Sequence, residues 1–195
     1  MISYANIKAL YGKKGYPFYS SEFDLNLFGF RNQSPVVDKF DDILGAAWID
    51  ADGKGNCAIF SGTTKPGIDW LQNPMAATGT AIVKAGYYPS LWTPGDHHGY
   101  RALVQNGDVT VYRDNNRDGK IDLIPGTEET GNFGINMHHA GLTDGDEVGK
   151  YSAGCQVFTH IADFNFIMSL VDAQIKAGIA STFSYALFNN VDMVG

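Results

Sequence analysis

The chain has 195 residues, of which 44% are hydrophobic and 18% charged, and its net charge at neutral pH is −7. This length fits one domain, residues 1–195, and the composition is that of a globular protein rather than a disordered one. The acidic balance argues against a nucleic-acid partner, because phosphate binding needs a basic face, and it disfavours simple adhesion to anionic membranes or wall polymers.

The first twenty residues contain neither a continuous apolar stretch nor a small-residue cleavage site. We therefore expect no signal peptide, and no segment is long and apolar enough to predict a membrane span. The two cysteines are far apart in the sequence, which gives little reason to expect a disulfide. We expect Cys57 to be a buried strand residue and both thiols to be reduced.

In chain order, the first predicted element is a short helix over about residues 1–15, which Gly12 and Gly15 end. Strands are predicted at 25–31, at 45–50 and 56–62 as a hairpin around the turn 51–55, and at 81–83. Residues 100–105 and 109–113 are predicted as another hairpin, because Asn106-Gly107 favours a tight turn between them. A strand over 134–138 follows.

After Cys155 the pattern of apolar residues changes to a spacing of three and four, which predicts an amphipathic helix over 162–176 that ends near Gly178. Residues 182–188 then form a strand. The predicted fold class is mainly β with one C-terminal amphipathic helix, an α+β arrangement.

The segment 134–158 carries the strongest functional signal. Sixteen residues separate His138 from Cys155, and Cys155 follows the small residues Ser152, Ala153 and Gly154. Such a turn exposes a side chain and brings backbone N–H groups close to it. A thiol there needs only a base within hydrogen-bond reach to become an acyl-transfer nucleophile.

This arrangement resembles the catalytic domain of the L,D-transpeptidase (YkuD-like) family, whose signature is a histidine, about fifteen to seventeen residues, and then Ser/Thr-x-Gly-Cys. Residues 59–67 (IFSGTTKPG) and 77–83 (ATGTAIV) resemble the family's upstream strand, loop and strand. The resemblance covers about residues 45–160. The chain also resembles single-domain proteins of this kind carried by Bacteroidetes bacteria and their phages.

The resemblance implies a β-sandwich-like mixed sheet and a peptidoglycan stem peptide as substrate. It implies that Cys155 attacks an amide between an L-centre and a D-centre, giving a thioester, with His138 as the base. It further implies that the His139 backbone carbonyl orients His138 and that backbone N–H groups around Gly154 meet the oxyanion. Ser152 completes the signature, and the chemistry requires no cofactor.

Many family members carry an arginine two residues after the cysteine, where this chain has Val157. Its absence, together with the phage-like resemblance, favours hydrolysis by a lysin-like carboxypeptidase or endopeptidase over transpeptidation. A non-catalytic wall-binding or virion structural protein with the same fold is the alternative. The expected location is the periplasm or cell wall after cytoplasmic synthesis and release, or a phage virion or lysis machinery.

Two histidine pairs need separate interpretation. His138 is preferred to His139 as the base, because neighbouring residues on a strand point to opposite faces. His97 and His98 are expected to line the cleft, with His98 and Tyr100 as candidate substrate-binding residues. The spacing of these pairs does not resemble that of a zinc site.

A candidate calcium loop follows the strand at 109–113. Oxygen donors at alternate positions surround Gly119, as in the first nine positions of an EF-hand loop. The candidate ligands are Asp114, Asn116, Asp118, Lys120 and Asp122. The twelfth position is Pro125 instead of glutamate, so an acidic solvated turn remains the other interpretation. The shorter Asp50-x-Asp52-Gly53 segment is interpreted as the hairpin turn alone.

Overall fold

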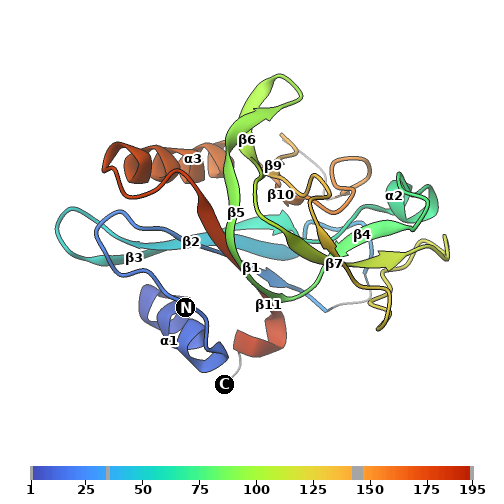
Figure 1. The fold of residues 1–195 in the computed structure, drawn as a ribbon, viewed down its shortest axis with the longest axis horizontal. Coiled ribbons are helices and arrows are strands. Elements are labelled where there is room, and N and C mark those ends of the chain that lie inside the picture. The colour runs from blue at the N-terminus through green and yellow to red at the C-terminus, as the bar shows by residue number, and fades with distance from the viewer. Residues whose placement is uncertain (1, 34–35, 142–146, 194–195) are drawn as a thin grey trace.

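The computed structural model describes residues 2–33, 36–141 and 147–193, and it is mainly β with a large mixed sheet (Figure 1). The large sheet contains β1 (Asn26–Arg31), β2 (Asp42–Ile49), β3 (Gly55–Thr63), β5 (Gly86–His97), β6 (Tyr100–Gln105), β9 (Met137–His139), β10 (Gln156–Phe158) and β11 (Phe183–Asn189). A small sheet contains β4 (Thr80–Val83), β7 (Val109–Asp114) and β8 (Glu129–Gly131). The helices are α1 (Tyr4–Lys14), α2 (Ile68–Gln72), α3 (Ile161–Lys176) and a 3-10 turn, η1 (Asn190–Met193).

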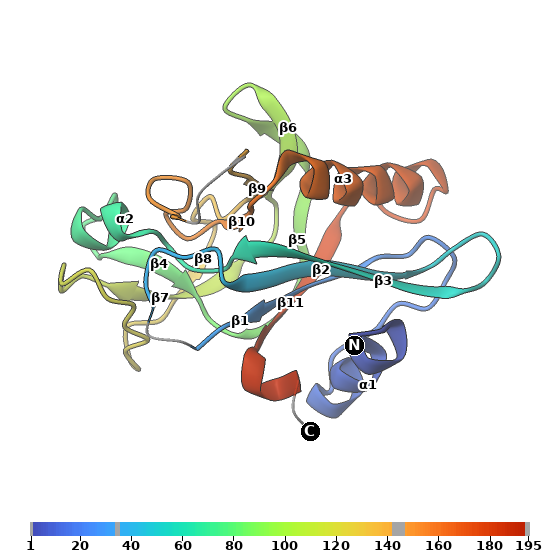
Figure 2. The same cartoon turned by 180° about the vertical axis from the view of Figure 1, so that it is seen from behind.

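The eight strands of the large sheet close into a barrel in the order β1-β11-β5-β6-β9-β10-β3-β2. Two of the pairings are parallel, β1 with β11 and β9 with β10, and the others are antiparallel. Strand β11 therefore lies between β1 and β5, which places the end of the chain beside its beginning (Figures 1 and 2).

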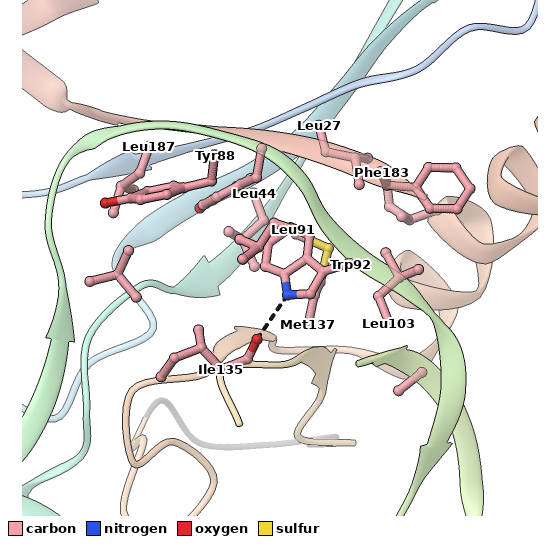
Figure 3. Close-up of a cluster of buried hydrophobic side chains, with 14 of the residues drawn as sticks. Leu27, Leu44, Tyr88, Leu91, Trp92, Leu103, Ile135, Met137, Phe183 and Leu187 are labelled. Carbon is pink, nitrogen blue, oxygen red and sulfur yellow. Dashed lines mark hydrogen bonds between the residues drawn. The ribbon is translucent and has the colours of Figure 1, made fainter. Parts of the chain in front are cut away.

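The barrel interior is filled by apolar side chains around Trp92, which is fully buried. Its indole Nε1 donates a hydrogen bond to the Ile135 carbonyl at 2.8 Å (Figure 3). This bond satisfies the one polar atom of a large buried ring and fixes the backbone just before β9. The core thus positions the strand that carries His138.

Helix α1 covers the outside of the barrel. Its first turn is closed by a capping box between Ser3 and Asn6, and Gly15 ends it with φ of +70°. Ile7 and Tyr11 are buried in a second apolar cluster, against outward-facing side chains of the sheet. Helix α3 packs Phe164 and other apolar residues into the main core, in agreement with the spacing of apolar residues that predicted an amphipathic helix.

Most predicted elements are present, with shifts of a few residues at their ends. The helix predicted at 1–15 is α1, the 45–62 hairpin is β2–β3, and the helix predicted at 162–176 is α3. The chain has further helices besides the C-terminal one. The long strand β5 and the short strands β8 and β10 had not been predicted.

The predicted hairpin between 100–105 and 109–113 is wrong. Strand β6 pairs with β5 and β9, whereas β7 pairs with β4 and β8 in the small sheet. The backbone N–H groups of Asn106 and Gly107 both donate to the Leu91 carbonyl of β5, at 2.6 and 3.1 Å. The turn is therefore hydrogen-bonded to β5, and after the turn the chain leaves the barrel for the small sheet.

Among the helices of the described residues, none is long and apolar enough to cross a membrane.

Candidate active site

A cleft of about 960 Å³ opens beside β9 and β10, and Cys155, His138, His97, His98 and Tyr100 all line it. The β5–β6 hairpin brings three of these residues, because His97 ends β5, Tyr100 begins β6 and the two pair in register. The turn between them has positive φ at His98 (+52°) and Gly99 (+89°), as a tight two-residue hairpin requires.

The parallel pairing of β9 with β10 places the cysteine and the histidine on one face. Gln156 lies opposite Met137 and Val157 opposite His138. Since side chains alternate along a strand, Cys155 immediately before β10 faces the same way as Asn136 and His138. The side chains of Met137 and Gln156 point to the other face, where Met137 lies in the main core.

The turn before Cys155 holds the thiol close to the backbone of the preceding strand segment. The Asn136 N–H donates to Sγ at 3.4 Å, and Sγ lies 3.6 Å from the Gly134 carbonyl, to which the thiol donates. Gly154 has φ of +128°, and a β-carbon there would lie 2.6 Å from the Ala81 carbonyl of β4. Only glycine permits this close approach of the turn to the small sheet.

Hydrogen bonds from two neighbours determine the tautomer of His138. Its Nδ1 lies 3.1 Å from the His139 carbonyl and 3.2 Å from Tyr100 Oη, while Tyr100 Oη donates to the same carbonyl at 3.3 Å. Because a carbonyl only accepts, Nδ1 carries the proton. The neutral ring therefore presents an unprotonated Nε2, the form that a general base needs.

His138 is buried, with 4% of its surface exposed, and the His97 ring stacks on it at 4.2 Å between centroids. The pKa of His138 is lowered from 6.5 to about 4, first by burial and then by the neighbouring His97, although the bond to the His139 carbonyl opposes the shift. The imidazole is therefore neutral at neutral pH.

The Cys155 thiol is also held in its neutral form. Burial raises the pKa of Cys155 from 9.0 to about 11, with a smaller opposing effect from the Asn136 N–H. Both shifts favour the neutral partners, so they give no support to a standing thiolate–imidazolium pair.

Ser152 braces the turn and uses one of the expected oxyanion donors. Its Oγ donates to the Cys155 carbonyl at 2.8 Å and accepts from the Gly154 N–H at 3.2 Å. The Gly154 N–H is thus engaged within the turn, whereas the thiol accepts from the Asn136 N–H.

Part of the cleft lining was not anticipated from the sequence. It includes Trp70 of α2 and Arg113 of β7, together with Phe133 and Lys150. The Arg113 guanidinium lies 4.5 Å from the Phe133 ring centroid, and its Nε is paired with Glu129 at 2.7 Å. These residues come from separate parts of the chain, so no local pattern marks them.

Val157 is fully buried, packed with Phe40 and Val148. An arginine at this position would place a charge inside an apolar cluster. The cations of the cleft are instead Arg113 and Lys150, against Asp96 as the acidic residue of the lining. Arg113 is compensated by Glu129, so Lys150 and Asp96 leave the lining close to neutral overall when its histidines are neutral.

The two free thiols have different surroundings. Cys57 lies on β3, half-buried beside the cluster under α1, and burial raises its pKa to about 11 as well. Cys155 alone lines the cleft.

The candidate calcium residues lie outside the cleft lining, in the loop that follows β7. Within the described ranges, no three His, Cys, Asp or Glu side chains are already arranged to hold a metal ion.

Comparison of the chain with protein-family models, with curated proteins and with solved structures found no match.

Proposed function

We propose that the protein is a cysteine-dependent acyl-transfer enzyme that acts on peptidoglycan stem peptides, with an L,D-transpeptidase-like fold. The observation that carries this proposal is the shared face of Cys155 and His138 in one cleft, with the His138 tautomer fixed by Tyr100 and the His139 carbonyl. A cysteine with only a structural role would not need to line a cleft or to lie beside an imidazole whose orientation is fixed.

The burial of both groups favours proton transfer during attack rather than before it. The thiol would exchange its contact with the Gly134 carbonyl for one with His138 Nε2 as substrate enters. Sγ then bonds to the carbonyl carbon while its proton passes to Nε2. The imidazolium returns this proton to the departing amine, and the thioester remains on Cys155. The Cys155 N–H is the nearest donor to the oxyanion.

Two cations in the lining support a substrate that carries carboxylates. Stem peptides contain free carboxylates, and Arg113 and Lys150 line the cleft together with the histidines. Arg113 is paired with Glu129 and donates to the Gly79 carbonyl at 3.3 Å, which holds its guanidinium in place. His98 and Tyr100, the substrate-binding candidates from the sequence, line the same cleft.

Water or an amine can resolve the thioester, giving hydrolysis or an L,D-cross-link. Hydrolysis is favoured, because Val157 replaces the arginine that the resembled family uses and is buried in apolar surroundings. The second candidate is a non-catalytic wall-binding protein. The neutral, half-buried thiol favours that candidate, since a standing thiolate is not needed for binding.

Purified sacculi and a synthetic tetrapeptide stem test both candidates. We expect mass spectrometry to show loss of the terminal D-residue or cleavage of L,D-cross-links, and Cys155→Ser to lower the rate about a thousandfold or more. Cys57→Ser is the matched control and should keep full activity.

A trapped thioester mass on Cys155 would extend the proposal to the mechanism. Equal turnover by Cys155→Ser and the unaltered protein would remove the nucleophile assignment. Pelleting of the protein with sacculi without any product, unchanged in Cys155→Ser, would establish the binding candidate.

A further inference from the structure

The loop after β7 contains a buried carboxylate oxygen without a partner. Asp114 is 1% exposed, and its Oδ1 has no hydrogen bond, whereas Oδ2 accepts the Asp122 N–H at 3.1 Å. An unpaired buried carboxylate oxygen is costly, because the charge loses its hydration without compensation. Since Oδ2 bonds to the far end of the loop, the carboxylate lies within the loop.

Local hydrogen bonds between its own residues hold the loop in a defined turn. The Asp118 N–H donates to Asn116 Oδ1 at 3.1 Å, and the Lys120 N–H donates to Asp118 Oδ1 at 2.9 Å. Gly119 reverses the chain with φ of +74°.

Two side chains of the loop now contact the carboxylates of Asp122 and Asp118. Asn116 Nδ2 donates to Asp122 Oδ2 at 2.6 Å, and Lys120 Nζ lies 3.5 Å from Asp118 Oδ2. Rotation of the Asn116 amide would turn its oxygen toward Asp122, at the cost of the hydrogen bond that Oδ1 now accepts from the Asp118 N–H.

We propose that this loop binds a calcium ion through Asp114 Oδ1, the side chains of Asn116, Asp118 and Asp122, and the Lys120 carbonyl. Calcium accepts six to eight oxygen ligands in flexible geometry, and waters complete such a set. Asp118 and Asp122 close inward on binding, since the described side chains do not yet converge. The ion gives the unpaired Asp114 oxygen its partner.

The affinity is low, because no bidentate glutamate completes the site. Pro125 occupies the twelfth position. Glu128 is engaged by Lys84 at 2.9 Å and by the Gly126 N–H at 2.6 Å, and Glu129 pairs with Arg113. Loops of this kind bind in the range of about 0.1–1 mM, as extracellular calcium modules do.

Calcium binding would also tie the loop to the wall of the cleft. A β-carbon at Gly119 would lie 3.1 Å from Gln72 Nε2 and 3.5 Å from Ile68, so the loop packs directly on α2. Helix α2 carries Trp70 into the cleft lining. The site is thus structural, and it does not depend on the proposed reaction.

Thermal unfolding of chelator-treated protein in 0 to about 10 mM calcium chloride tests the proposal. We expect the midpoint to rise by about 5 °C, because a ligand bound only by the folded state stabilises it by mass action. Magnesium should raise it less, since it demands a stricter geometry. Titration calorimetry should give about one ion per chain.

Asp114→Asn should abolish the response, and Asp118→Ala, at an exposed position, should do so without disturbing the core. Asp52→Asn is the matched control, because the β2–β3 turn has a similar sequence. In that turn both oxygens of the Asp50 carboxylate already accept hydrogen bonds, from the N–H groups of Asp52 and Lys54 and from Asn56 Nδ2. No rise with calcium, an equal rise in Asp118→Ala, or loss of the response in Asp52→Asn would each overturn the site.

Discussion

Burial predicts that Cys155 ionises far above neutral pH, and the rate of its alkylation measures this directly. A pKa of about 11 instead of 9.0 leaves about one thiol in ten thousand ionised at pH 7, roughly a hundredfold fewer than in an unburied cysteine. Only the thiolate reacts with iodoacetamide. A raised pKa therefore predicts a rate that increases about tenfold with each pH unit from 6 to 9, without a plateau.

The measurement uses Cys57→Ser protein, in which Cys155 is the only thiol. Mass spectrometry follows the alkylated fraction at each pH, and tryptophan fluorescence shows that the fold persists. His138→Gln should change these rates less than about threefold, because a neutral imidazole does not hold a thiolate. A plateau at or below pH 7 that disappears in His138→Gln would refute the burial argument and establish an ion pair.

Two further predictions concern the support of the site and of the barrel. Tyr100→Phe removes the hydroxyl that contacts His138 Nδ1 and the His139 carbonyl. Turnover of a stem peptide should therefore fall about five- to twentyfold, with little change in KM. An unchanged kcat would show that the His138 tautomer does not depend on this hydroxyl. Asp42→Asn should lower the free energy of unfolding in urea by about 3–5 kcal/mol, because Asp42 is buried with Lys65 and Arg31 and accepts from Thr64. Asp172→Asn, in the exposed pair with Arg101, should lower it by less than about 1 kcal/mol. Similar losses in the two variants would contradict the role of burial.

The elements that the sequence predicts well are those whose signals are local. Helix α3 follows from apolar spacing, and the β2–β3 hairpin from its acidic glycine turn. Strand β5 was missed because Pro89, Pro94 and Gly95 suppress the strand signal, although its edges are filled by β11 and β6. The Asn106-Gly107 turn gave a false hairpin, since its partner is a carbonyl on β5 rather than the next strand.

In the candidate site, too, the sequence predicts what depends on a local motif and misses what depends on strand pairing. The signature predicts that His138 and Cys155 share a site; both line one cleft, and the parallel register of β9 and β10 places them on one face. The oxyanion role of the N–H groups around Gly154 stays a prediction, and the sequence gives no sign that Ser152 Oγ accepts from the Gly154 N–H. Arg113 could not be predicted as part of the cleft, because it arrives through the pairing of β7 with β4, far from Cys155 in sequence.

The position of β11 between β1 and β5 has a consequence for synthesis of the protein. Leu27 pairs with Tyr185, so the barrel stays open until β11 has left the ribosome. Until then β1 and β5 present unpaired edges, which invite association with other nascent chains. The Tyr185 hydroxyl also donates to Gln156 Oε1 at 2.8 Å, one residue from Cys155. A chain without β11 therefore lacks both the closed barrel and this support beside the thiol.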